Sequence, residues 1–248
     1  MRIAYENYID STTTLTALTA VAGLPIENVQ EQRLSVVYKT TAVTSQSVII
    51  NFGSAKSINT AAILGHNFTS SVTVTVSANS SDSWPGATSQ TITYNSDIML
   101  KFFTTETYQY WKFSIDDPTN TAGFLSIGRL WLGQYIDFSP ASNLDFTVTK
   151  NRSDIVTHGR HRQKFSSIGS MWRTINLSFP LTEEAMIVKL NTMFNYTGNH
   201  SSLIFCNFDT IRNNILVEPL YCSVNGNLDF NHQNRQKYTY TLKLEEEK

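Results

Sequence analysis

The stretch Val72-Thr-Val-Thr-Val-Ser-Ala78 alternates apolar and small polar residues over a full strand length. The same alternation occurs in Tyr110-Trp-Lys-Phe-Ser-Ile115, where Trp111, Phe113 and Ile115 share one face. A period of two residues indicates a β-strand with one buried and one solvated face, as in antiparallel sheets. These two stretches therefore predict an antiparallel β-sandwich for the first half of the chain.

Further strands lie on both sides of these two. Gln46-Ser-Val-Ile-Ile-Asn-Phe-Gly53 places three apolar side chains on one face, and Ile127-Gly-Arg-Leu-Trp-Leu-Gly133 reads as a later strand of the same kind. A short strand is also expected at 34–38. Turn signals such as Pro85-Gly86 and Asp116-Asp-Pro118 separate the strands. Many short strands at this spacing are typical of a sandwich or jelly roll.

Taken in order, these segments resemble the discoidin-like family (coagulation factor 5/8 type C, galactose-binding-like domains). The valine-rich strand leads to Ser80-Ser-Asp82-Ser-Trp84, a shortened form of the family's Ser-x-Asp-x-x-Trp turn. The aromatic strand Tyr108-Gln-Tyr110-Trp-Lys-Phe113 and the closing strand 127–133 follow in the family's order. The resemblance covers about residues 35–133 and implies a jelly-roll β-sandwich. Because the turn is short and flanking cysteines are absent, it implies no ligand residues.

The whole chain also looks like bacteriophage tail proteins, which couple a galactose-binding-like sandwich to a C-terminal β domain with one helix. The similar segments are Gly23-Leu-Pro25-x-x-Asn28, Ile63-Leu-Gly65-His-Asn67, Gly128-Arg-Leu-Trp-Leu-Gly133 and the strand–helix–strand run 172–208. This resemblance implies a virion protein of the tail tip or baseplate, such as a distal tail protein. The implied partners are other copies of the chain in a symmetric ring, together with tail tube and tail-tip proteins.

The chain is expected to be mostly β and to contain two domains. Residues 1–136 form the predicted discoidin-like jelly-roll sandwich. Residues 137–143, which include Pro140, are the predicted linker. Residues 144–248 form a second β domain that carries one α-helix.

The helix is predicted at about residues 182–196. The run Pro180-Leu-Thr182-Glu-Glu184 opens it, with Thr182 as the expected N-cap and the two glutamates at its positive end. Leu190 contributes to an apolar stripe along one face. Gly198 is expected to end it.

Composition excludes several classes of protein. The net charge is −1 and charged residues make up 16%, so no global field attracts the chain to nucleic acid. No run approaches the roughly 18 apolar residues of a membrane span, so we expect no membrane insertion. Glu6 and Asp10 fall where a signal peptide needs its apolar core. We therefore expect synthesis in the host cytoplasm, and the resemblance to tail proteins implies a final location in the virion.

Two cysteines, Cys206 and Cys222, lie sixteen positions apart. A disulfide between neighbouring strands is one interpretation. The other is a pair of free, buried thiols, which suits a chain that is not secreted.

A basic stretch runs from Lys150 to Lys164 without clear periodicity. Its cations are Lys150, Arg152, Arg160, Arg162 and Lys164, and Asp154 is its one acid. One interpretation is an inter-subunit arm that meets acidic partners in an assembly. The other is a solvated hairpin. His158 and His161 lie in the same stretch, but no third ligand lies at useful spacing, so we expect no metal.

Four residues are candidate glycan contacts on the sandwich: His66, Asn67, Trp84 and Tyr94. His66 and Asn67 follow Ile63-Leu-Gly65 and could orient a sugar, or they could serve the turn itself. Trp84 and Tyr94 could stack on sugar rings, although Trp84 could instead fill the core under its turn. Asp116-Asp-Pro118 could hold calcium at a sandwich edge, or form a turn in which aspartate binds the backbone.

The sequence gives no indication of catalysis or of a cofactor. It contains no Gly-x-Ser-x-Gly, no phosphate-binding glycine loop and no His-Glu-x-x-His. The absence of these motifs favours a non-enzymatic protein, and the resemblance to tail proteins implies a structural subunit of a bacteriophage tail tip or baseplate that works through oligomeric contacts. The alternative is a carbohydrate-binding module or host-receptor adhesin on the same fold, with a surface glycan as its partner.

Overall fold

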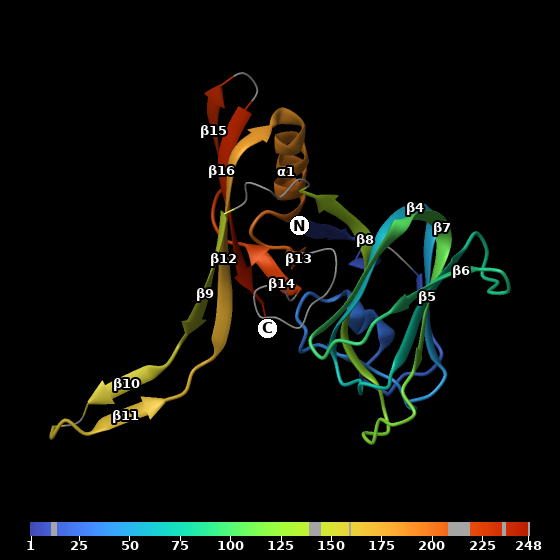
Figure 1. The fold of residues 1–248 in the computed structure, drawn as a ribbon. Helices are drawn as coiled ribbons and strands as arrows, with labels where there is room; N and C mark the ends of the chain where they lie inside the picture. The colour runs from blue at the N-terminus through green and yellow to red at the C-terminus, as the bar shows by residue number, and fades with distance from the viewer. Residues whose placement is uncertain (11–13, 139–144, 159, 208–218, 235–236, 248) are drawn as a thin grey trace. The chain divides into compact units, whose positions relative to one another are not determined.

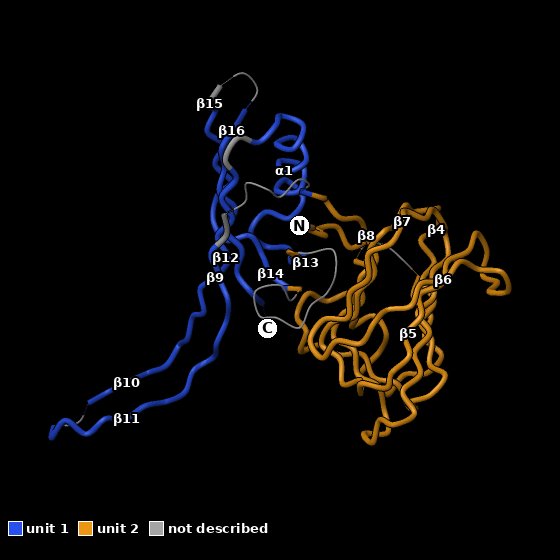
Figure 2. Tube along the Cα trace, in the orientation of Figure 1, with its two compact units in different colours: residues 1, 138–203, 220–248 blue, residues 2–137, 204–219 orange. Residues whose placement is uncertain are grey.

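The computed structural model describes residues 1–248 apart from 11–13, 139–144, 159, 208–218, 235–236 and 248 (Figure 1). The chain divides into two compact units (Figure 2). Unit 2 contains residues 2–137 and 204–219, and unit 1 contains residues 1, 138–203 and 220–248. Most of the predicted linker, from residue 139 on, lies outside the described residues, and the domain limits stay a prediction.

Unit 2 is an antiparallel β structure. It contains β1 (Arg2–Asn7), β2 (Thr14–Ala17), β3 (Tyr38–Lys39), β4 (Gln46–His66), β5 (Thr73–Asn79), β6 (Thr88–Ile92), β7 (Ile98–Asp116) and β8 (Ser126–Asp137), with 3₁₀ turns at Tyr8–Asp10 and Ile26–Gln30. The strand order is β6-β5-β7-β4-β8-β1, and residues 204–206 of β13 (Ser202–Cys206) pair with β1. β2 pairs with β4, and β3 pairs with β8.

The core of unit 2 lies where the alternating pattern predicts it. Trp111, Phe113 and Ile115 on β7 are at most 2% exposed. Trp111 lies opposite Ile50 on β4 and opposite Ala78 on β5, so one row of the sheet is apolar across three strands. Each such fully buried large side chain contributes about 1.5–3 kcal/mol through the hydrophobic effect.

The short strand expected at 34–38 is wrong for most of its length. The Val36 N–H donates to the Arg33 carbonyl at 3.1 Å and closes a turn, and β3 starts only at Tyr38. This turn packs on β8: a Cβ placed on Gly128 would lie 2.6 Å from the Leu34 carbonyl oxygen. Only glycine therefore fits at the start of the closing strand.

The N-terminal segment is fixed to β8 by two side chains. The Asn7 amide donates to the Leu130 carbonyl at 2.9 Å and accepts the Leu132 N–H at 3.0 Å. Arg129, only 1% exposed, forms an ion pair with Asp10. Burial raises the pKa of Asp10 to about 6, while Arg129 and Asn7 act in the opposite direction. Asn7 and Ile9 are therefore buried in unit 2, and Asp10 reaches a buried cation from the surface.

Unit 1 is a second β structure with one helix. It contains β9 (Asp145–Arg152), β10 (Ile155–His158), β11 (Lys164–Ser167), β12 (Met171–Glu183), α1 (Glu184–Thr197), β14 (Leu220–Val224), β15 (Asp229–Asn234) and β16 (Lys237–Glu246). Its sheet has the order β14-β16-β12-β9, with β15 also paired to β16. β10 and β11 form a separate hairpin. The predicted fold class, a mostly β chain with a sandwich followed by a β unit carrying one helix, is confirmed.

The helix starts two residues later than predicted, and Thr182 is not its N-cap. Thr182 and Glu183 still pair with Tyr238 and Lys237 of β16, so the strand runs on to the first helical residue. Glu183 occupies the cap position and makes no side-chain cap bond. The predicted end is confirmed: Gly198 has a φ of +50°, and its N–H donates to the Phe194 carbonyl at 2.7 Å.

Both cysteines are free and buried, so the disulfide interpretation is wrong. No helix within the described residues has the length and hydropathy of a bilayer-crossing segment.

Candidate functional site

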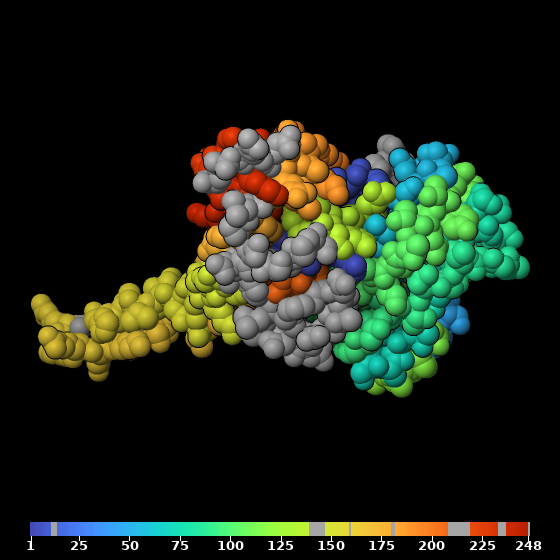
Figure 3. Space-filling model, turned by 45° about the horizontal axis from the view of Figure 1, so that its top comes forward, coloured from blue at the N-terminus to red at the C-terminus, as the bar shows by residue number. Residues whose placement is uncertain are grey.

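The basic stretch forms an antiparallel hairpin that projects from the rest of unit 1 (Figure 3). β10 and β11 pair from Ile155 opposite Ser167 to His158 opposite Lys164. Every described residue from Arg152 to Ile168 is exposed. We call residues 155–167 the arm.

The register gives the arm two different faces. Side chains alternate along a strand, and residues that lie opposite each other share a face. Ile155 and Phe165 therefore point to one side, where they are 65% and 58% exposed. Val156, His158 and Lys164 point to the other side. One face of the arm thus carries Ile155 and Phe165 beside Thr157 and Ser167, and the other carries Val156, a cation and a histidine.

Residues 152–154 and 169–170, which we call the neck, join the arm to the β9–β12 part of the sheet. The Ser153 N–H donates to the Ser170 carbonyl at 3.1 Å, and the Ser170 N–H donates to the Ser153 hydroxyl at 3.0 Å. Asp154 accepts the Gly169 N–H and the Arg152 Nε, both at 2.7 Å. The Gly169 N–H is the main reason that the pKa of Asp154 lies below its usual range. These bonds fix where the arm leaves the sheet.

Of the five predicted arm cations, Arg160, Arg162 and Lys164 lie on the arm, whereas Lys150 and Arg152 lie at the end of β9; all five are exposed. Arg152 binds Asp154 of the neck. Within the described part of the chain, the other four have no carboxylate within ion-pair distance. The stretch is an exposed hairpin in this chain, and the inter-subunit role of its cations stays a prediction.

Two of the four candidate glycan residues have their polar groups bound inside unit 2. The His66 Nε2 lies 3.0 Å from the Asn95 carbonyl, and its Nδ1 accepts the Phe68 N–H at 3.2 Å. Burial is the main cause of a lowered pKa for this imidazole. The Asn67 amide donates to the Phe124 carbonyl and accepts the Ser126 N–H. Both residues therefore hold turns together.

The two candidate aromatic residues lie in different segments. Tyr94 is half-buried and meets His66 edge-on, with ring centroids 6.1 Å apart. Trp84 lies in the connection between β5 and β6, and the Lys112 ammonium lies over its ring at 4.4 Å. It is half-buried and outside the buried core, so the core-filling interpretation of Trp84 is wrong.

The Asp116-Asp-Pro118 segment is a turn that binds the backbone. The Asp117 carboxylate is fully buried and accepts the Thr69 N–H at 2.8 Å and the Asn120 amide at 3.2 Å. Asp116 accepts the Ser45 N–H at 2.8 Å. No group of three or more His, Cys, Asp or Glu side chains suited to a metal is present among the residues that the structure describes.

Sequence reasoning missed the apolar residues of the arm. The signal was present: Ile155-Val-Thr-His158 and Lys164-Phe-Ser-Ser167 are two short runs of strand-forming residues around Gly159. The basic residues between and beside them hid this pattern.

No protein-family profile matches the sequence, and no curated protein matches it. Among solved structures, a family 32 carbohydrate-binding module from Clostridium perfringens in complex with galactose is 18% identical, with a TM-score of 0.42. The match covers 55% of this chain and 100% of that one. A second module from Clostridium perfringens, of the CBM32 type and in complex with GalNAc-β-1,3-galactose, is 13% identical with a TM-score of 0.43, covering 52% and 100%.

Chitosan-binding module 1 from the chitosanase/glucanase of Paenibacillus sp. IK-5 is also similar. It is 17% identical with a TM-score of 0.43, and the match covers 52% of this chain and 99% of that one. These are likenesses over about half of the chain at low identity. We assign no ligand to this chain from them.

Proposed function

We propose that this protein is a non-catalytic structural subunit of a bacteriophage tail tip or baseplate that assembles through its arm. The observation that carries the proposal is the exposed arm, in which Ile155 and Phe165 share a face that no described residue covers. The partner is a second copy of the chain, and closed symmetry makes the product a ring.

Physical chemistry supports a partner on the apolar face. A two-stranded hairpin by itself is marginally stable in water. Covering Ile155 and Phe165 would contribute on the order of 2–4 kcal/mol, because each is about two-thirds exposed and full burial contributes about 1.5–3 kcal/mol. Binding would therefore stabilise both the complex and the arm.

Charge supports a second copy as the partner. Residues 150–164 hold five basic residues and one acid, a net charge of +4. The net charge of the whole chain is −1, so the remaining residues carry −5. The basic stretch 150–164 of one copy, which includes most of the arm, is therefore attracted to the rest of another copy, which speeds encounter and makes assembly sensitive to salt.

The test is the mass of the full chain in solution over a range of concentrations, measured by analytical ultracentrifugation. We expect a concentration-dependent oligomer. The double variant Ile155→Ser/Phe165→Ser should be monomeric, whereas Val188→Ser, an equally exposed apolar site on α1, should assemble normally. A monomer at every concentration, or equal assembly by all three proteins, would show the proposal to be wrong.

The position in the particle needs its own measurement. Cryo-electron microscopy of purified phage particles should show density for this chain at the tail tip, and its absence from the particles would overturn the virion assignment.

The second candidate function is carbohydrate binding by unit 2. The half-buried Trp84 favours it, because its ring lies on a surface connection where a sugar could stack. A glycan array probed with wild type and Trp84→Ala tests this candidate. Binding that Trp84→Ala abolishes would support it, and binding that survives would exclude Trp84.

A further inference from the structure

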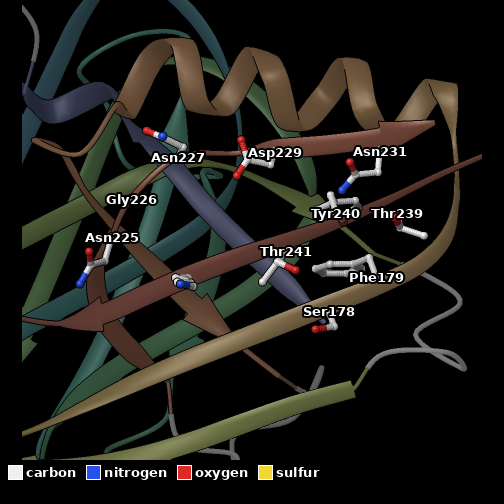
Figure 4. Close-up of a pocket in the computed structure, with 11 residues that line it drawn as sticks. Ser178, Phe179, Asn225, Gly226, Asn227, Asp229, Asn231, Thr239, Tyr240 and Thr241 are labelled. Atoms are coloured by element: carbon white, nitrogen blue, oxygen red, sulfur yellow. The ribbon is translucent and has the colours of Figure 1, made fainter. Parts of the chain in front are cut away.

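Unit 1 contains an open cavity of about 830 Å³ between β12, β16 and the segment that joins β14 to β15 (Figure 4). Its size falls within the range of roughly 300–1,000 Å³ found for small-molecule sites. All of its lining residues belong to unit 1. It is separate from the arm and from the candidate glycan residues of unit 2.

The cavity arises because β14 and β15 pair with successive parts of the same edge of β16 and leave a gap between them. β14 pairs with β16 up to Val224 opposite Leu244, and β15 pairs with it from Asp229 opposite Thr241. Between them, residues 225–228 leave the ladder through Gly226, which has a φ of +101°. The Asn225 N–H still donates to the Lys243 carbonyl at 2.9 Å, so the connection stays attached to the sheet.

Strand register places a row of polar side chains along this cavity. Ser178 on β12, Thr241 on β16 and Asp229 on β15 lie directly opposite one another. In the next row, Asn231 lies opposite Thr239. Because residues that lie opposite each other share a face, these side chains all point to the same side of the sheet. Ser178, Thr241, Asp229 and Asn231 are exposed.

Several of these polar groups are available to a ligand. Within the described part of the chain, Asn227, Asp229, Asn231 and Thr241 make no side-chain hydrogen bond to protein. Asn225 differs, because its amide donates to Glu245. Amides and hydroxyls can both donate and accept hydrogen bonds, and a carboxylate accepts them. The cavity thus offers both kinds of partner to a ligand that carries both.

The charges of the lining select against an ionic ligand. Among the described residues of the lining, only Asp229 and Lys243 are charged, and their charges cancel. A phosphate or a polyanion would meet the Asp229 carboxylate, and a polycation would meet the Lys243 ammonium. Phe179 and Tyr240 also border the cavity, but they alternate with Ser178 and Thr241, so their stacked rings lie on the opposite, buried side of the sheet.

We infer that this cavity, which we call the β12–β16 cleft, is a binding site for a neutral oligosaccharide. A neutral sugar presents hydroxyls that both donate and accept hydrogen bonds and carries no net charge, which matches this polar lining. The inference depends neither on assembly through the arm nor on Trp84.

The test uses the full chain on an array of defined neutral and acidic oligosaccharides, followed by calorimetric titration of the best neutral hit. Asp229→Ala and Thr241→Val should each weaken binding roughly two- to tenfold, which is what the loss of one hydrogen bond of about 0.5–1.5 kcal/mol produces. The double variant Asp229→Ala/Asn231→Ala should bring binding below detection. All of these positions are exposed, so the unfolding temperature should stay within a few degrees.

Matched controls separate the cleft from the other proposals. Thr147→Val on β9 and Glu184→Gln on α1 alter exposed residues outside the cleft and should leave affinity unchanged. Trp84→Ala should bind normally, and Ile155→Ser/Phe165→Ser should lose assembly while keeping affinity for the sugar. No array binding, binding only to acidic glycans, or binding that is lost in Trp84→Ala and kept in Asp229→Ala would each overturn the inference.

Discussion

Replacing Asn7 with alanine should destabilise unit 2 strongly, although the side chain is small. The Asn7 amide satisfies two backbone groups of β8, the Leu130 carbonyl and the Leu132 N–H, in a region where both residues are fully buried. An unsatisfied buried backbone group costs about 1–3 kcal/mol, so two of them cost about 2–6 kcal/mol. The variant also removes a hydrogen bond that Asn7 donates to the Asp10 carboxylate.

Urea denaturation followed by tryptophan fluorescence measures this loss, because three of the four tryptophans, at positions 84, 111 and 131, lie in unit 2. At a slope of about 2 kcal/mol per molar urea, the midpoint should fall by about 1–3 M. Asn51→Ala is the matched control. Its amide binds Gly53 and Gln109 near the surface, where water can replace it, so a loss under about 1 kcal/mol is expected. Equal shifts in the two variants would refute the role assigned to Asn7.

Three further predictions concern other parts of the chain. Trp111→Ala should lower the free energy of unfolding by about 3–5 kcal/mol, because it leaves a cavity in the core. Lys112→Ala, on the opposite face of β7, should barely change the urea midpoint. Equal effects would mean that the side chains of β7 face the other way. Burial lowers the pKa of His66 below 6.5, so the unfolded chain binds a proton more readily than the folded one. Stability should therefore fall as the pH drops through about 6.5, and denaturation curves of His66→Gln should lack that part of the dependence. Limited trypsin digestion should cut first at Arg160 or Arg162 on the exposed arm. If trypsin cuts elsewhere first and leaves the arm intact, the arm is not the most accessible segment of the chain.

The strand faces of unit 2 could be predicted from the sequence because burial follows a local rule. Trp111, Phe113 and Ile115 alternate with polar residues, and the structure buries these three side chains. The fold class follows from the same alternation. Local patterns succeed here because each strand needs only to place its apolar residues on one side of the sheet.

Pairing between distant segments could not be predicted in this way. Residues 204–206 pair with β1 across almost the whole chain, and nothing in either segment names its partner. The bonds of Asn7 to β8 join residues more than 120 positions apart. The charges of Glu6 and Asp10 do not indicate a partner in the sequence. The buried partner of Asp10, Arg129, becomes visible only once β1 and β8 lie side by side.

The β12–β16 cleft illustrates the same limit for a binding site. Asp229, Thr241 and Ser178 come from three strands, and their sequence separations give no hint that they form one row. An exposed row of polar side chains also has the composition of any solvated sheet face. What sets it apart is the hollow that residues 225–228 create when they leave the ladder, together with charges that cancel.

The arm differs from the cleft because its function rests on an exception to the burial rule. A strand pair that belongs to one chain alone normally buries its apolar face, since an exposed one loses the stabilisation that drives folding. Ile155 and Phe165 remain exposed, and yet the neck bonds at Ser153 and Asp154 fix the direction in which the arm leaves the sheet. A fixed, cationic and partly apolar projection is suited to a surface outside its own chain. Assembly is therefore the function that we propose for the arm, and the oligomer mass of Ile155→Ser/Phe165→Ser is the measurement that tests it.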